Sequence, residues 1–330
     1  MGLWYSISGI LSLILLVVIG IEGIGLYSFF AIFIPYLAVF LFITGFIYRV
    51  LKWAGSPVPF HIPTVSGQQK SLPWIKADSI DSAFTTGGVV KRLALEVLLF
   101  RSLLKNEKVE LEAPQRILFR TSTLLWLGAM AFHWSLLVIL LRHLRFFLEP
   151  VPSVVVILQR LDSILQGLLP IIYISDLILL IALAYLFLRR VIYPQVRYIS
   201  LPSDYFVLLV IAGIVLSGVL MRLIYRVDLV QVKEWVMAML RFSPLPPKGV
   251  NLVFYIHLFF VSLLVAYFPL SKLMHMPGIF LSPTKNLRNT SRNDRHINPW
   301  DHPVKMHTYE EYEEEFRDSM KEVGLPVEKE

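Results

Sequence analysis

The 330-residue sequence contains no cysteine, and this absence excludes several kinds of site. Without thiolates the chain forms no disulfide, supplies no cysteine ligand to an iron–sulfur cluster or a thiolate zinc site, and has no motif for covalent haem attachment. A redox centre in this chain must therefore be held by histidine, methionine or carboxylate side chains. Charged residues are also scarce, at 17% against about 25% in typical soluble proteins, which argues against most soluble enzymes.

Hydrophobic residues make up 56% of the chain, and the mean hydropathy is +0.64. A membrane-spanning helix needs about 20 apolar residues. Six stretches qualify, at about 3–25, 27–51, 117–147, 163–189, 204–226 and 250–274. The first two share one apolar run, which we interpret as a hairpin that turns at Gly23–Tyr27. The sequence predicts an all-α integral membrane protein with about six transmembrane helices.

The positive charges between these stretches predict an orientation. Nineteen lysines and arginines fall in the 52–116 loop, the 190–203 loop and the tail from residue 275, against four in the loops of the opposite face. Because cytoplasmic loops carry the excess of positive charge, both termini are expected in the cytoplasm and the protein in the cell membrane. We expect four parts: an N-terminal helix pair (1–51), a cytoplasmic loop with an amphipathic helix (52–116), a four-helix core (117–274) and a cytoplasmic tail (275–330).

The cytoplasmic tail is predicted to end in an acidic helix. Thr308 and Glu311 have the spacing of a capping box, and glutamates follow at 310–315 around an aromatic stripe. Two interpretations stay open: a solvated amphipathic end, or a docking helix for a soluble partner.

Four histidines are the candidate functional residues. His133 and His143 lie in the third stretch, and His257 and His275 in and just after the sixth. Ionisable side chains inside a membrane are costly and are functional candidates by default. The two helices are antiparallel, so His143 should meet His257 near the outer face and His133 should meet His275 near the inner face. Two stacked pairs of imidazoles would suit two b-type haems; the alternative is four histidines that only pack between helices.

The expected rise between the two histidines differs between the two helices. At about 1.5 Å per residue, the ten residues from His133 to His143 rise about 15 Å, and the 18 residues from His257 to His275 rise about 27 Å on a continuous helix. We expect helix tilt, and a bend at Pro269, to absorb the difference.

Other polar residues are candidates for contacts with a quinol or with haem propionates. They are Arg142, Arg145, Arg160, Arg222 and Lys272. The competing interpretations are snorkelling to the interface for the arginines and an inner-face anchor for Lys272. Asp176, near the middle of the fourth stretch, would be an expensive lone carboxylate, which is either hydrogen-bonded to a helix backbone or part of a proton path.

At this level the sequence resembles a known family, the haem b membrane subunit (gamma subunit) of respiratory nitrate reductase, over about residues 34–290. The resemblance rests on the four histidines, on Leu188–Arg190 followed by Tyr193–Arg197, on Asp204, and above all on His257-Leu258 followed by Phe268–His275. Within the family, Glu96–Ser102, Arg295–Trp300 and the extra N-terminal span look most like the cytochrome b subunit of the sulfite-reduction-associated membrane complex, called DsrM or HmeC.

The resemblance implies a dihaem cytochrome b with two non-covalent bis-His haems, one on His133 and His275 and one on His143 and His257. It implies oxidation of menaquinol near the outer face and electron transfer inward, in sulfate or sulfite respiration. The implied acceptor is a cytoplasmic iron–sulfur subunit resembling the catalytic subunit of heterodisulfide reductase, with further membrane and cytochrome c subunits in the complex. The family's quinol-pocket lysine has no match here: the same offset from His143 reaches Ser163, and the nearest base is Arg160.

Three alternatives stay open. The cytochrome b subunit of a methanogen-type heterodisulfide reductase is a close relative. A non-redox anchor would hold a cytoplasmic partner only through its loop and tail. A transporter would use Asp176 and Arg222 in a substrate path, but the sequence has no visible inverted repeat.

Overall fold

The computed structural model describes residues 2–56, 67–105, 107–112, 116–167, 172–289 and 306–328, without the side chains of 107–112, 116–120 and Leu165. The chain divides into two units, one of residues 1–56 and 90–286 and the other of residues 57–89 and 287–330. The first unit is the helical bundle. The tail segment with Arg295–Trp300 lies outside the described residues.

The N-terminal apolar run forms two helices joined by a turn, which we call the N-terminal hairpin. Helix α1 (Gly2–Val18) continues into a π-helical turn at Ile19–Gly23, and a second π-helical turn at Phe29–Phe33 leads into α2 (Ile34–Ala54). Gly25, which has a positive φ of 75°, lies in the connecting turn. At the other end of α1, Ser6 donates a hydrogen bond to the carbonyl of Pro202 at 2.8 Å, so α1 is fixed against α9.

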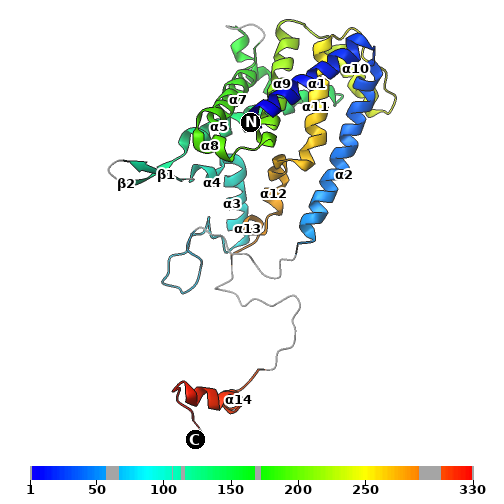
Figure 1. The fold of residues 1–330 in the computed structure, drawn as a ribbon. Coiled ribbons are helices and arrows are strands. Elements are labelled where there is room, and N and C mark those ends of the chain that lie inside the picture. Colours follow the sequence, from blue (N-terminus) through cyan, green and yellow to red (C-terminus); the bar gives the residue numbers. More distant parts are fainter. Residues whose placement is uncertain are drawn as a thin grey trace. The chain divides into compact units, whose positions relative to one another are not determined.

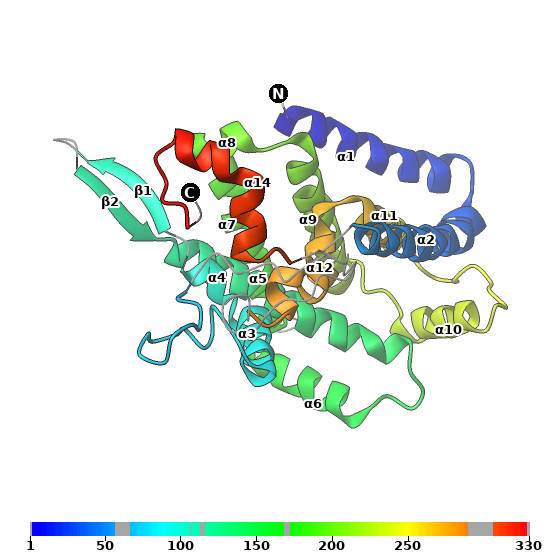
Figure 2. The same ribbon diagram turned by 90° about the horizontal axis from the view of Figure 1, so that it is seen from below.

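The remaining long helices complete the bundle (Figure 1). They are α5 (Thr123–His143), α7 (Ile174–Ile192), α9 (Pro202–Leu223) and α11 (Leu252–Tyr267). Helix α5 packs on α7, α7 on α9, and α9 on both α1 and α11, while α11 also packs on α2. Figure 2 shows the same helices from below. Helix α9 therefore lies at the centre of the contacts, next to both α7 and α11.

The prediction of an integral membrane protein is confirmed. Among the described residues, five helical segments are long and apolar enough to cross a membrane: Gly2–Gly23, Phe29–Ala54, Thr123–Phe146, Pro202–Leu223 and Leu252–Leu270. The fourth expected stretch, 163–189, contains α7, which begins only at Ile174 and spans about 28 Å at 1.5 Å per residue. The expected start of this stretch was therefore wrong.

Short elements surround the bundle. They are α3 (Thr86–Leu99), α4 (Arg101–Leu104), α6 (Ser153–Asp162), α8 (Pro194–Ile199), α10 (Leu229–Leu240), α12 (His275–Leu281) and α13 (Pro283–Asn286). Helix α3 contains the predicted amphipathic helix. Its end is held against α5, because Trp126 and Trp134 donate to the carbonyls of Leu99 and Leu98 at 2.7 and 3.2 Å.

A two-stranded hairpin was not expected from the sequence. Strands β1 (Glu107–Glu112) and β2 (Arg116–Thr121) pair antiparallel, from Glu107 opposite Thr121 to Glu112 opposite Arg116. The third span therefore begins at Thr123 and not at 117. The charged residues Arg116 and Arg120 make this stretch less suited to a membrane interior, and its run of Ile117 to Phe119 favours a strand.

The tail unit contains α14 (Tyr309–Glu322). Its predicted capping box is confirmed: Thr308 Oγ1 accepts from the Glu311 amide at 3.3 Å, and the Glu311 carboxylate accepts from the Thr308 amide at 3.1 Å. Tyr309, Tyr312 and Phe316 remain exposed on this helix, as expected for the aromatic stripe.

Candidate functional site

His133 and His275 lie next to each other at one end of the bundle. His133 is in the middle of α5, and His275 is the first residue of α12. Their ring centroids are 6.1 Å apart, and the ring planes are nearly perpendicular, at 87°. The rings of Phe100 and Phe132 lie 5.0 and 5.1 Å from the His133 ring. Phe100 lies in the loop that was expected to contain the amphipathic helix, and it separates α3 from α4 with a left-handed φ of 47°.

His143 and His257 lie toward the other end of the bundle. His143 is the last residue of α5, and His257 is in the second turn of α11. Helix α9 supports His257 through Ser217, whose hydroxyl lies 3.0 Å from Nδ1, and through Gly218, where an added Cβ would lie 3.4 Å from His257 Cε1. Each predicted pair therefore combines one histidine of α5 with one histidine of α11 or α12.

The four imidazoles share one pattern of hydrogen bonding. In each, Nδ1 lies within hydrogen-bond distance of a backbone carbonyl: Ala129 for His133 (2.8 Å), Ile139 for His143 (2.7 Å), Ile214 for His257 (3.0 Å) and Lys272 for His275 (2.8 Å). A carbonyl oxygen only accepts, so Nδ1 must carry the proton. Each neutral ring then has its lone pair on Nε2, which is the arrangement of a metal-ligating histidine fixed by its second nitrogen.

The donor set fits haem iron better than a bare metal ion. Within the described part of the chain no three His, Asp or Glu side chains gather as a metal site would require, whereas a haem needs only two axial imidazoles from the protein. Two imidazoles on opposite sides of one metal ion, with metal–nitrogen bonds of roughly 2 Å, have ring centroids about 6 Å apart. The separation of His133 and His275 agrees with this value.

Arg142, next to His143, is the centre of a buried ion cluster. Its guanidinium contacts the carboxylate of Asp162 at 2.7 Å and that of Asp176 at 2.8 Å. Asp162 also accepts from the amide and hydroxyl of Ser175, at 2.8 and 2.6 Å. The arginine therefore joins α5, α6 and α7. It does not snorkel to the surface, because its side chain is only 8% exposed.

Asp176 differs from its expected place and environment. It lies in the first turn of α7, not in the middle of a span, and it is paired with Arg142. A second guanidinium, that of Arg222, lies 3.6 Å from the ring centroid of Tyr173, and Arg142 lies 3.7 Å from the same centroid. Tyr173 is buried, so two of the predicted arginines meet on one aromatic ring. Sequence reasoning missed Asp162 and Tyr173. The signal that could have found them is the need of a membrane arginine for partners.

The other predicted basic residues do not join this cluster. Arg145 donates to the side chain of Gln159 at 3.1 Å, and Arg160 is exposed. Lys272, next to the break before α12, contacts the Asp204 carboxylate at 2.7 Å. Asp204 also accepts from the Leu201 amide at the start of α9. Lys272 thus links the segment that carries His275 to α9.

Comparisons with known proteins give the chain its context. Residues 93–291 match the family described as nitrate reductase gamma subunit. The chain is 43% identical over 279 residues to a protein of Archaeoglobus fulgidus named Hdr-like menaquinol oxidoreductase cytochrome b-like subunit, with 82% of this chain and 83% of that protein covered. A protein of Archaeoglobus profundus with the same name is 41% identical over 283 residues, covering 84% and 83%.

Proposed function

Because the chain belongs to the nitrate reductase gamma subunit family, we propose that it is the dihaem b membrane subunit of a quinol-oxidising respiratory complex. The observation that carries this proposal is the arrangement of the four histidines in two pairs. All four imidazoles are fixed through Nδ1, and the ring centroids of His133 and His275 are 6.1 Å apart. The relatives' printed names favour menaquinol as the electron donor.

His133 and His275 would hold the inner haem, and His143 and His257 the outer haem. When bound, the two haems would supply one-electron acceptors along the bundle. The chain's own contribution is to fix the imidazoles: α5 supplies two carbonyl acceptors to its own histidines, and Ile214 and Ser217 of α9 orient His257. Phe100 and Phe132 pack against the ring of His133.

The orientation follows from the distribution of positive charge, with both termini in the cytoplasm and His143 toward the outer face. Quinol would release its protons on that outer side, and electrons would move inward to a cytoplasmic iron–sulfur subunit. That subunit would resemble the catalytic subunit of heterodisulfide reductase and would contain the clusters that a chain without cysteine does not ligate. Further membrane and cytochrome c subunits would complete the complex.

Within this proposal the four parts expected from the sequence have separate roles. Residues 117–274, extended by His275, hold the haems, and the hairpin within 1–51 packs against them. The loop of 52–116 and the tail of 275–330 would face the partner subunits, with α14 as a docking helix.

The test is haem content after substitution of single histidines. We expect His133→Leu and His275→Leu to lose the same haem, and His143→Leu and His257→Leu to lose the other, each with about half of the reduced-minus-oxidised absorbance. His307→Gln, an exposed histidine before α14, is the matched control. Two intact haem spectra in every variant would contradict the assignment. Normal electron transfer in a complex whose four histidines were all replaced would favour the non-redox anchor.

A further inference from the structure

A pocket at the His257 end of the bundle joins the N-terminal hairpin to α11. It has a volume of about 400 Å³, within the range of small-molecule sites, and its polar lining consists of Glu22, Tyr27, Tyr225, Asn251 and Tyr255. The hairpin residues Glu22 and Tyr27 lie outside residues 93–291, which match the family. This pocket is therefore formed partly by a segment that the family match does not include.

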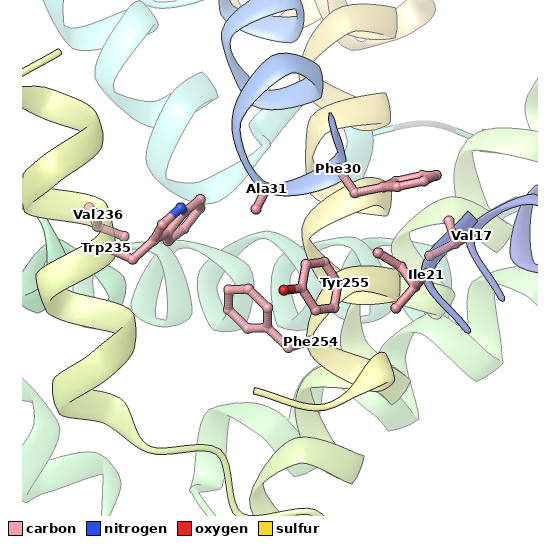
Figure 3. Close-up of a cluster of buried hydrophobic side chains, with 8 residues drawn as sticks. All are labelled: Val17, Ile21, Phe30, Ala31, Trp235, Val236, Phe254 and Tyr255. Atoms are coloured by element: carbon pink, nitrogen blue, oxygen red, sulfur yellow. The ribbon is translucent and has the colours of Figure 1, made fainter. Parts of the chain in front are cut away.

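The walls of the pocket are well fixed. Val17, Ile21, Phe30 and Ala31 of the hairpin pack with Trp235 and Val236 of α10 and with Phe254 and Tyr255 of α11 in one buried cluster (Figure 3). Tyr255 is only 3% exposed, and its ring lies 5.7 Å from that of Tyr27. Asn251 caps α11 through the Phe254 amide at 3.2 Å and also donates to the carbonyl of Tyr225 at 3.3 Å. Asn251 thus holds the two sides of the pocket together.

Glu22 is the chemically distinctive member of this lining. It is the only acidic residue among the first 77, and the π-helical turn at Ile19–Gly23 presents it at the exposed edge of the pocket. Such turns occur frequently at functional sites. No lysine or arginine lines the pocket, and among the described residues the Glu22 carboxylate forms no hydrogen bond. Its oxygens are therefore open to a donor from a ligand.

The lining selects for a neutral aromatic ligand with hydroxyl groups. Tyrosine rings supply an apolar wall, and phenols and a carboxylate supply hydrogen-bond partners. A second cavity, beside α10, is lined by Glu149, Lys233, Glu234 and Arg241, and its Lys233 and Glu149 form an ion pair. That charged lining suits water better than an aromatic ring. Exposed apolar side chains at Ile24 and Leu26 extend from the first pocket along the hairpin turn, where an isoprenoid tail would leave toward lipid.

We propose that this pocket binds the quinol head group and that Glu22 accepts its protons. The inference rests on the proposed function, because it takes the outer haem as the electron acceptor. Asn251 precedes His257 by six residues, a rise of about 9 Å on a helix, so the pocket lies directly outward of the outer-haem ligand.

One quinol becomes one quinone and loses two protons and two electrons. Each O–H bond breaks with its proton passing to the Glu22 carboxylate, which releases the first proton to the water outside before it takes the second. The outer haem, which His143 and His257 would hold, would accept the two electrons one at a time and pass each on before it takes the next.

Photolabelling tests the location of the site. Membranes that contain the whole complex are illuminated with an azido-naphthoquinone, and labelled peptides are identified by mass spectrometry. We expect labels within residues 19–27, at Tyr225 or within 250–255. Labels confined to residues 142–163, or no label on this chain while both haem spectra are intact, would overturn the inference and leave the haem assignment standing. Absence of haem would instead refute the proposed function.

Substitution of Glu22 tests the proton acceptor. Glu22→Gln keeps the shape of the side chain and should slow haem reduction by menadiol about 100-fold, the scale of general base catalysis. Photolabelling of the pocket and haem reduction by dithionite should be unchanged, because neither needs the carboxylate. Glu234→Gln, an exposed carboxylate of the other cavity, is the matched control and should behave as wild type. Equal menadiol rates in Glu22→Gln and Glu234→Gln would overturn the role of Glu22.

Discussion

Removal of the Arg142 side-chain charge should destabilise the bundle more than any other arginine substitution near His143. The side chains of Arg142, Asp162 and Asp176 are only 8%, 5% and 16% exposed. Water can therefore replace little of the charge pairing and hydrogen bonding that the guanidinium gives to the two carboxylates. In Arg142→Gln, Asp162 keeps its two hydrogen bonds from Ser175, but Asp176 loses its hydrogen bond from Arg142. Breaking a buried ion pair from one side costs about 3–5 kcal/mol, and we expect a loss in that range.

The effect is measured by unfolding the purified protein in mild detergent with increasing SDS, followed by tryptophan fluorescence. Arg145→Gln is the matched control: the residue lies one turn further along and, in the described part of the chain, contacts only neutral groups, Gln159 and the Phe146 ring, so its loss should cost about 1 kcal/mol. Arg142→Lys should fall between the two, because lysine keeps the charge but not the planar fork that reaches two carboxylates.

A double variant tests whether Arg142 and Asp176 stabilise the bundle as one unit. Once Arg142 is replaced, Asp176 is a mostly buried carboxylate that has lost its hydrogen-bonded guanidinium, so adding Asp176→Asn should restore part of the lost stability. The two changes should be non-additive by about 0.5–3 kcal/mol. Additive losses, or an Arg142→Gln variant no less stable than Arg145→Gln, would show that the cluster is not the stabilising unit that its distances imply.

Three further outcomes are expected. Gly213→Val should destabilise the α9–α11 contact by about 1–3 kcal/mol in the same SDS titration, because a Cβ there would lie 2.7 Å from the Phe260 ring. Ser217→Ala should weaken retention of the outer haem about tenfold against a competing haem-binding protein, since His257 keeps only the Ile214 carbonyl. Thr308→Ala should remove about 1 kcal/mol from α14, seen as lower helix content by circular dichroism in the isolated tail peptide relative to the wild-type peptide.

The membrane class, the hairpin and the family were predictable from the sequence, because each depends on patterns that can be recognised without a three-dimensional structure. Apolar runs of about 20 residues, a capping box and a set of motifs with fixed spacing are all local. The ends of elements were less predictable. Residues 117–119 are apolar and lie next to the third span, but with Arg120 and Thr121 they pair with Glu107–Leu111 as a strand, and the pairing partner is not visible in the local sequence.

The ion cluster was not predictable for a related reason. Arg142 and Asp176 were each identified as costly residues in a membrane, but their partners come from different helices. Asp162 lies 20 residues after Arg142 at the end of α6, and Tyr173 lies just before α7. A sequence shows which charges need compensation, whereas the helix packing determines which side chains provide it.

The structure of the segment between His257 and His275 accounts for the difference in helical rise between the two histidine-bearing segments. On one continuous helix the separation of about 27 Å could not match the rise of about 15 Å on α5. Helix α11 ends at Tyr267, Ser271 has extended dihedral angles of −107° and 176°, and short 3₁₀ turns flank it. The sequence predicted helix tilt and a bend at Pro269, which underestimates this change.

The break also explains how His275 reaches His133. Gly45 of α2 leaves room for Pro269 at the break, since a Cβ there would lie 2.9 Å from the proline ring, and Lys272 ties the far side to Asp204 of α9. The unwound segment is thus held by two helices, and it turns the start of α12 toward α5, where the two rings meet at 6.1 Å. The motif from Phe268 to His275 therefore acts through its backbone. It shortens the rise along the helix axis and moves His275 sideways toward α5, and the contact between His275 and His133 depends on this shift.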